Sequence, residues 1–261
     1  MKNRYKVQRE IAGGNPWYIS EQLQNLRNQS QRRTIERRWS FINTCIEKMH
    51  FLHPERKLRI LDAGCGDGIN LTILSKIPYA RVTACDYNPL RLDRTRKAFL
   101  NVEVIEQNLT NVQMAKDSFD IILCSQVLEH IREDMVVLGE LKRILSEDGV
   151  LIIGVPNEGC FLAKLRNRVL EPHICKTTDH VHFYTEKEFV EKLNSAGFSV
   201  RDRFYENFFF PKQSINNYFA SREWGLKFMN ILQKILPSQA AGFYFAAMHS
   251  DGGIETQRRH K

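Results

Sequence analysis

The sequence predicts an α/β protein with a doubly wound, mostly parallel, seven-stranded sheet, preceded by a helical cap and carrying a helical insert before the last strand. Three observations lead to this fold class. Five short segments are apolar and poor in charge, as strands buried on both faces are. Segments of helical periodicity separate them, which favours parallel pairing through crossovers. Two further strand-like segments lie near the C-terminal end.

The predicted strands are short and are bounded by turn residues or by helical segments. The five alternating strands are expected at 58–64, 81–86, 102–108, 119–125 and 149–156, and the two later strands at 198–210 and 242–249.

The helices between these strands carry recognisable start and stop signals. A helix is expected over 70–77, after a glycine-rich turn, and a second begins at Pro89, where proline is tolerated in the first turn. A third, over 134–145, gathers its apolar residues on one face. For a fourth, Thr185 and Glu188 form a capping box and Gly197 provides the stop.

Two segments lie outside this alternation. Residues 1–57 are expected to form a helical arm or cap on a body of residues 58–261, with Ser20 as a helix N-cap. An apolar stripe of Ile35, Trp39, Ile42 and Ile46 should pack on the body. The insert at about 211–238 is expected to be a helical lid over the sheet.

Composition excludes several classes of protein. With 43% hydrophobic and 26% charged residues, the 261-residue chain is neither disordered nor collagen-like. It contains no run of 18 apolar residues, so no membrane span is predicted. Its six cysteines are scattered without a C-x-x-C pair, which indicates reduced thiols and a cytoplasmic location.

The net charge of +8 lies entirely within residues 1–59, the arm and the start of the first predicted strand. Residues 1–59 hold 13 Lys and Arg against 5 Asp and Glu, whereas the remaining residues balance. Such an arm could meet an anionic substrate, a nucleic acid or a membrane surface, but a solvated helix face is the simpler interpretation.

The most informative motif is LDAGCGDG, residues 61–68, at the end of the first predicted strand. Its glycines permit a sharp turn and close approach of a ligand. Asp86 ends the second strand, where an acid can accept the hydroxyls of a ribose. Asp62 and Asp67 would repel a pyrophosphate, and Ile69 replaces the third glycine of a dinucleotide fingerprint. The charges therefore favour S-adenosylmethionine (SAM), a cationic nucleoside without phosphate.

At this point the sequence resembles the class I SAM-dependent methyltransferases, whose fold is Rossmann-like. Segments resembling five motifs of that family follow one another in the family order over about residues 58–205, and the similarity is greatest to the ubiquinone/menaquinone-biosynthesis type. The five segments are LDAGCGDG, ACDYNP, DSFDIILCSQVLEHI, LKRILSEDGVLIIGVPN and HFYTEKEFVEKLNSAGF.

The resemblance implies cofactor roles for individual residues. Asp62, Gly64, Cys65 and Gly66 would line the methionine end of SAM. Asp86 would hold the ribose and Tyr87 would lie against the adenine. Asn108 stands where the family usually has an Asp for the adenine amino group, and Leu109 beside it is counted with the cofactor-binding residues. Ser125 and Gln126 would close over the methionine.

Methyl transfer mainly requires alignment, but a hydroxyl acceptor also needs a base. The candidates for this catalytic role are Glu129 and His130, after the fourth strand, and His180. A structural role is equally expected for His130 and is favoured for His182.

The predicted reaction is methyl transfer to a small-molecule or lipid-like acceptor, at oxygen. An alternative is metal-assisted RNA 2′-O-methylation, since some such enzymes carry E-x-x-E-H followed by a later His. Here Gln126 replaces the first acid, and one carboxylate with two histidines would bind magnesium poorly, so no metal is assigned. A non-catalytic SAM-binding module is a further alternative. Contact of the lid with a membrane surface and the oligomeric state are left open.

Overall fold

The computed structural model describes residues 2–173 and 179–250, which form one seven-stranded sheet in the order β3-β2-β1-β4-β5-β7-β6. The first five strands pair in parallel, and β7 runs antiparallel to both β5 and β6. The predicted mostly parallel, doubly wound sheet is therefore confirmed. The strands are β1 (Leu58–Ala63), β2 (Ala80–Asp86), β3 (Glu103–Glu106), β4 (Phe119–Ser125), β5 (Leu145–Pro156), β6 (Phe198–Tyr205) and β7 (Gly242–His249).

Strands β6 and β5 differ most from their predicted bounds, for reasons of pairing. Strand β6 ends at Tyr205 rather than at residue 210, because its partner β7 begins at Gly242 and the ladder stops there, apart from an isolated bridge between Phe208 and Ala240. Strand β5 begins at Leu145, before Gly149, because Leu145 already pairs with Phe119 across a register shift.

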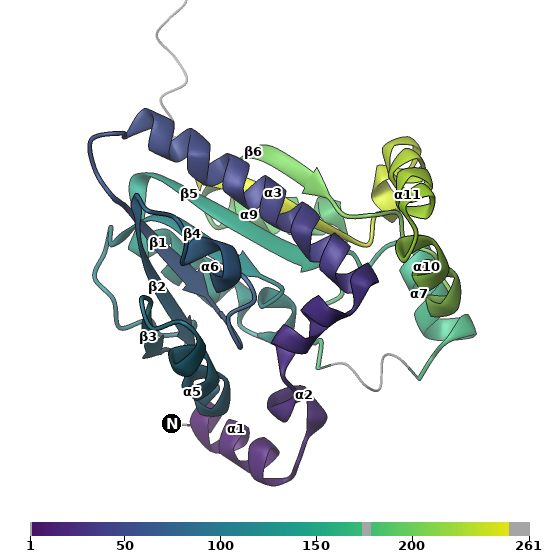
Figure 1. Cartoon of the computed structure of the whole chain (residues 1–261), viewed down its shortest axis with the longest axis horizontal. Helices are drawn as coiled ribbons and strands as arrows, with labels where there is room; N and C mark the ends of the chain where they lie inside the picture. Colours follow the sequence, from purple (N-terminus) through teal and green to yellow (C-terminus); the bar gives the residue numbers. More distant parts are fainter. Residues whose placement is uncertain (1, 174–178, 251–261) are drawn as a thin grey trace, which may run out of the picture.

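Helices cover both faces of the sheet and create two cores. On one face, α3 (Gln29–Leu52), α4 (Leu71–Leu74) and α5 (Pro89–Ala98) pack on β1 and β2, and Figure 1 shows the long α3 lying across the sheet. On the other face, α6 (Asp134–Ile144) and α9 (Glu186–Ser195) bury their apolar stripes. The capping box predicted between Thr185 and Glu188 is present at the start of α9. Helix α4 is shorter than expected because the chain tightens after Leu74 into turns of the 3₁₀ type.

The N-terminal region contains α1 (Lys2–Ala12), α2 (Pro16–Ile19) and the 3₁₀ turn η1 (Gln22–Arg27) before α3. Ser20 is not an N-cap, so that prediction is wrong. It lies between α2 and η1, whereas Asn28 caps α3 by accepting bonds from the amides of Ser30 and Gln31. The predicted apolar stripe is confirmed, since Ile42 and Ile46 are fully buried.

After β5, the chain forms α7 (Phe161–Leu165) and a π-helical turn over Arg166–Leu170. The insert after β6 consists of α10 (Gln213–Ala220) and α11 (Glu223–Ile235), followed by the 3₁₀ turn η4 (Pro237–Gln239), and the two helices stand at one end of the sheet in Figure 1. Several of their large apolar residues are exposed, namely Ile215, Tyr218, Trp224, Phe228, Ile231 and Ile235.

Two sequence predictions concern composition rather than elements. None of the helices within the described residues is long and apolar enough to cross a membrane. Five of the six cysteines are buried as free thiols, and the sixth, Cys175, lies outside the described residues.

Candidate functional site

The glycine turn after β1 requires glycine for steric reasons. Gly64, Gly66 and Gly68 have φ angles of 79°, 55° and 86°, in the left-handed region that residues with a Cβ rarely adopt. A Cβ atom on Gly64 would also lie 2.5 Å from Cγ2 of Val127. The turn is fixed to β2, because the amides of Gly64 and Cys65 both donate to the carbonyl of Cys85.

Asp86, at the end of β2, fastens this turn as well as facing the space above it. Its Oδ2 accepts the amide of Gly66 at 2.9 Å, and its Oδ1 accepts the amide of Asn88 at 2.8 Å. Burial raises the pKa of Asp86, although these amides oppose the shift. A carboxylate has about four acceptor positions, and these two amides occupy two of them. Sequence reasoning assigned only the ligand role and missed the structural one.

Asp62 lies one layer behind the turn. It is 1% exposed, Asn70 Nδ2 lies 3.4 Å from its Oδ1, and its Oδ2 has no hydrogen-bond partner within the described residues. Burial raises the pKa of Asp62 to about 7. It does not line the cavity described next, so the expected lining role of Asp62 is corrected to one behind the wall.

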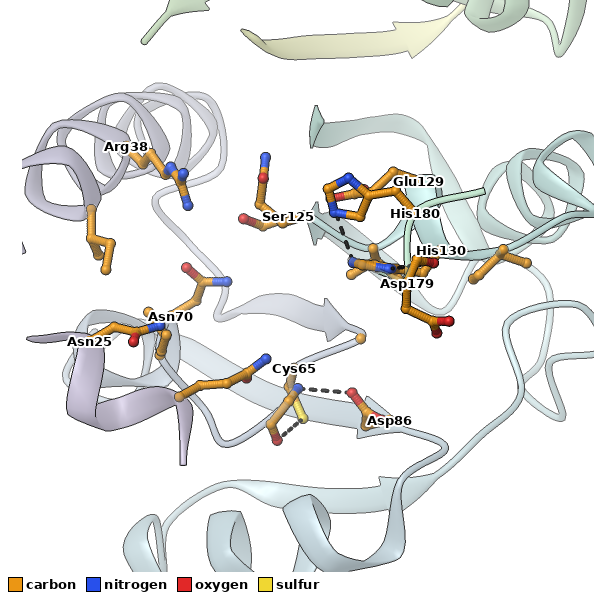
Figure 2. A pocket seen from close by; sticks show the side chains of 18 of the residues that line it. Asn25, Arg38, Cys65, Asn70, Asp86, Ser125, Glu129, His130, Asp179 and His180 are labelled. Carbon is orange, nitrogen blue, oxygen red and sulfur yellow. Dashed lines mark hydrogen bonds and ion pairs between the residues drawn. The ribbon is translucent and has the colours of Figure 1, made fainter. Parts of the chain in front are cut away.

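A cavity of about 750 Å³ opens above the carboxyl ends of the parallel strands, where α/β sheets bind ligands. The structure brings nearly all the predicted site residues to its wall, the catalytic candidates Glu129, His130 and His180 included. From the cofactor prediction these are Gly64, Cys65, Gly66, Asp86, Tyr87, Asn108, Leu109, Ser125 and Gln126. In Figure 2, Cys65 and Asp86 lie at one end of the pocket, and the three catalytic candidates lie together on another side.

Glu129, His130 and His180 form a compact group. One possible ligand atom from each lies within 4.8 Å of the others, and Glu129 Oε1 is 3.9 Å from His130 Nε2. His130 Nδ1 lies 3.3 Å from the carbonyl oxygen of Asp179, and His180 Nδ1 lies 2.6 Å from Oε2 of Glu158. The 3₁₀ turn Leu128–His130 after β4 supplies the first two, and the segment leading into α9 supplies the third.

Burial and neighbouring charges shift the pKa values of this group in different directions. Burial raises the pKa of Glu129 to about 7, since it disfavours the carboxylate. Burial, with the nearby His180, lowers the pKa of His130 to about 3. Burial acts downward on the pKa of His180 too, but the hydrogen bond and charge of Glu158 outweigh it and raise that pKa.

His182 takes the structural role that the sequence favoured. Its Nε2 lies 3.0 Å from the carbonyl oxygen of Ile131, and its ring stacks on Tyr184 at 5.3 Å. It is absent from the cavity wall.

Ser125 at the end of β4, Gln126 after it and Asn108 after β3 have local geometry suited to a ligand. Gln126 has a φ of 57°, which is strained for a residue with a side chain, and its buried Nε2 has no partner within the described residues. Ser125 shares a hydrogen bond of 2.7 Å with Tyr244. Asn108 uses its Oδ1 on the amide and hydroxyl of Thr110, so its Nδ2 is the group left to face the cavity.

The N-terminal region contributes residues that sequence reasoning missed. The amide of Gln22 donates to Asp67 Oδ2 at 2.6 Å, and Gln22 Oε1 accepts the amide of Asp67 at 3.2 Å. The hydroxyl of Tyr18 donates to Asp179 at 3.2 Å. Tyr18 and Gln22 thereby reach the cavity wall from outside the predicted body. Their positions follow from tertiary docking, and the sequence carries no signal for them.

The basic face of α3 is only partly solvated. Arg32 is exposed and pairs with Glu36, but Arg38 pairs with the buried Glu206. Arg37 donates to Asn207 in the same way. The prediction of a solvated face is wrong for Arg37 and Arg38, because both side chains extend from α3 to the segment that follows β6.

The donor set fits a cationic nucleoside such as SAM. Gly64 and Gly66 leave room that a Cβ would fill, and the acidic Asp86 stands at the turn. The orphaned oxygen of Asp62 lies behind it. A phosphate at this place would meet carboxylates, as the sequence indicated.

Comparison with known proteins agrees with this geometry. A family model described as "Methyltransferase domain" matches residues 32–202. A relative from Mycolicibacterium smegmatis, named a probable S-adenosylmethionine-dependent methyltransferase, is 28% identical over 143 residues, which is 55% of this chain and 52% of that protein. The chain thus spans about half the length of that relative.

A second relative and a solved structure point the same way. A protein from Campylobacter jejuni (strain 81-176), named a ubiquinone/menaquinone biosynthesis C-methyltransferase, is 24% identical over 193 residues, covering 65% of this chain and 81% of that one. A SAM-dependent methyltransferase structure from Methanosarcina mazei shares the fold with a TM-score of 0.52 at 19% identity, covering 77% of this chain and 98% of that one.

Proposed function

The chain belongs to the methyltransferase domain family, as its sequence motifs predicted, and from this membership we propose that it transfers a methyl group from SAM to a hydroxyl oxygen of a small-molecule or lipid-like acceptor. SAM as the cofactor follows from the family and from its relatives.

One observation carries the proposal. The acid-bearing glycine turn and the group of Glu129, His130 and His180 line the same cavity, so that a bound nucleoside and titratable side chains share one enclosed space. A cavity that only sensed SAM would have no need for this group.

The residues of the chain account for binding and orientation. When bound, SAM supplies a methyl group on a positively charged sulfur. Asp86 holds the ribose, while the glycine turn, Ser125 and Gln126 enclose the methionine end. Alignment of an acceptor with the S–CH3 bond supplies most of the acceleration, roughly 7–11 kcal/mol in favourable cases. Glu129, His130 and His180 are placed to receive the proton of an acceptor hydroxyl.

The acceptor end of the cavity is built largely by the cap and the insert. Ile35 comes from α3, Asn216 and Ala220 from α10, and Met229 from α11. The wall is therefore both polar and apolar, and the adjacent α11 exposes Trp224, Phe228 and Ile231. An acceptor with a hydroxylated end and an apolar part matches this surface, which supports the lid role of residues 211–238.

A nucleic-acid acceptor gains no support from α3, although its arginines motivated that alternative. Arg37 and Arg38 each donate a hydrogen bond inside the molecule, to Asn207 and Glu206. A gel shift that weakens with salt would be needed to restore it.

Product identification tests the proposal. The protein is incubated with methyl-labelled SAM and separate metabolite and lipid extracts, and labelled products are identified by mass spectrometry. Cleavage with hydrogen iodide then releases label from O-methyl ethers but not from C-methyl groups. The Gly64→Ala variant is the control without cofactor binding, since its Cβ would crowd the turn and Val127. A C-methylated product would contradict the oxygen assignment, and binding of SAM without any labelled product would favour the non-catalytic module.

A further inference from the structure

Glu129 is a buried acid whose oxygens the fold leaves unsatisfied. Its side chain is 1% exposed, and neither Oε1 nor Oε2 has a hydrogen-bond partner within the described residues. Leaving a buried carboxylate without partners is costly, and native structures rarely do so without a functional reason. By contrast, the buried Asp120 has four hydrogen bonds from Arg56 and Arg59 and one contact with Ser146.

Two imidazoles lie close to Glu129. His130 and His180 each bring a ring nitrogen into the same small volume, all three ligand atoms lying within 4.8 Å of one another. The ring edges meet at 67° with centroids 4.7 Å apart, so the two rings converge from different directions. Figure 2 shows the three side chains converging at the wall of the pocket.

Both imidazoles are oriented through Nδ1 by oxygen atoms. The carbonyl of Asp179 lies against Nδ1 of His130 at 3.3 Å, and the carboxylate of Glu158 lies against Nδ1 of His180 at 2.6 Å. Glu158 is itself held by Arg166 at 3.0 Å. Histidines that ligate metals through Nε2 characteristically have Nδ1 held by a carbonyl or carboxylate in this way.

We propose that Glu129, His130 and His180 form a three-ligand site for a divalent transition metal, at which the acceptor oxygen binds beside the methyl donor. The sequence analysis considered magnesium, which one carboxylate and two histidines would bind poorly. Two nitrogen donors and one carboxylate instead suit Mn²⁺, Fe²⁺, Co²⁺, Ni²⁺ or Zn²⁺. Three protein ligands also leave coordination positions open towards the cavity, as catalytic metal sites do.

In the proposed function, the metal would activate the acceptor hydroxyl, a role that the side chains would otherwise have to fill as bases. The existence of the site does not depend on methyl transfer, but its role with the acceptor rests on the proposed function. An acceptor hydroxyl bound to the ion loses its proton to water more readily. The oxygen then forms the O–CH3 bond as the S–CH3 bond breaks, and that bond's electron pair stays on sulfur as a neutral thioether. The step releases one proton and needs no oxidant or reductant.

Metal binding is measured directly on the full chain. The purified protein is stripped with EDTA and titrated with Mn²⁺ or Zn²⁺, with Mn²⁺ followed by electron paramagnetic resonance and total metal by mass spectrometry. We expect one ion per chain, with Mg²⁺ failing to displace it at millimolar concentration. Glu129→Gln and His180→Asn should weaken binding at least 100-fold. His182→Asn should leave it unchanged, because His182 does not line the cavity and its ring bonds to the carbonyl of Ile131.

A second measurement separates this inference from the proposed function. Binding of S-adenosylhomocysteine to each variant, by calorimetry, reports whether the fold and cofactor site survive, and we expect it to change less than threefold. Equal metal affinity in the wild type and Glu129→Gln, or an equal loss in His182→Asn, would overturn the site. Methyl transfer that continues undiminished in metal-free protein would also overturn the acceptor role, while leaving the SAM-dependent function intact.

Discussion

Replacing Asp86 with Asn tests whether this residue binds the cofactor as well as holding the turn. The carboxylate accepts two amides, from Gly66 and Asn88, and hydrogen bonds to charged groups are worth about 1.5–3 kcal/mol each. Asn keeps one acceptor but turns its NH2 group towards the other amide. Removing a buried charge returns part of this loss, because burial disfavours the carboxylate. We expect a net destabilisation of about 2 kcal/mol, or a melting temperature lower by roughly 4–8 °C.

The loss of cofactor affinity should exceed what this destabilisation explains. A ribose that bonds to the Asp86 carboxylate loses about 3 kcal/mol in the variant, which is on the order of 100-fold in Kd. Isothermal calorimetry with S-adenosylhomocysteine at 15 °C, well below both melting transitions, measures the affinity of folded protein.

Asn88→Ala is the matched control on the same turn. Asn88 caps α5 by accepting the amides of Leu90 and Arg91, and it does not line the cavity. Loss of such a cap costs about 1–2 kcal/mol, comparable to the expected destabilisation in Asp86→Asn. If both variants weaken binding equally for equal loss of melting temperature, Asp86 acts only through the turn and the ribose assignment is refuted.

Three further predictions concern the glycine turn and two buried acids. Gly64→Ala should lower the free energy of unfolding by about 1–3 kcal/mol and abolish detectable S-adenosylhomocysteine binding, because its Cβ would lie 2.5 Å from Val127 Cγ2. Adding Val127→Ala should restore part of this stability in urea titrations. No restoration would contradict the clash. Burial alone would raise the pKa of Asp120, but the hydrogen bonds from Arg59 and Arg56 outweigh it and hold that pKa well below its usual range. The ionised Asp120 therefore stabilises the folded state fully above about pH 4, and this stabilisation is lost as the pH falls further. Asp120→Asn should therefore destabilise the protein by about 2 kcal/mol at pH 7, with the gap to wild type narrowing below pH 4 in thermal melts; a constant gap would exclude the charge as its cause. Burial raises the pKa of Asp62 to about 7, so between pH 4 and 7 the folded protein holds a proton that the unfolded chain releases. The free energy of unfolding of the wild type should therefore fall from pH 4 to pH 7 and stay low above pH 7. Asp62→Asn should flatten this dependence on pH.

The sheet and the cofactor turn could be predicted because their determinants are local. Alternation of apolar strands and amphipathic helices, together with a Gly-rich segment after the first strand, specifies both the topology and the place of the turn. Thr185 and Glu188 fix the start of α9 through contacts three residues apart, which a sequence displays directly. Ser20 is of a residue type that caps helices, but α3 begins at Gln29 and its N-cap is Asn28. Asn28 is also of a capping type and adopts the extended backbone that a cap needs.

The metal-ligand geometry and the acceptor end lay beyond sequence reasoning because they depend on distant contacts. Glu129 and His180 are 51 positions apart, and nothing local shows that Glu158 and Asp179 orient the two imidazoles. Arg38 illustrates the same limit. Its place in a run of arginines predicted an exposed side chain, but it pairs with Glu206, which lies 168 positions later in the sequence.

The cap predicted for residues 1–57 takes part in the cofactor site. Gln22 and Asp67 exchange two hydrogen bonds, Asn88 Nδ2 donates to the carbonyl of Tyr18, and Tyr18 reaches Asp179, next to His180. At about 1 kcal/mol each, these four bonds contribute a few kcal/mol to the docking of residues 16–27, beside the two that Arg94 donates to the carbonyls of Ile19 and Ser20. A ligand that fixes the turn also fixes Asp67, the partner of Gln22, so cofactor binding and docking of this segment stabilise each other by linkage. Residues 16–27 are thus joined energetically to the glycine turn and, through Asp179, to the neighbourhood of His180.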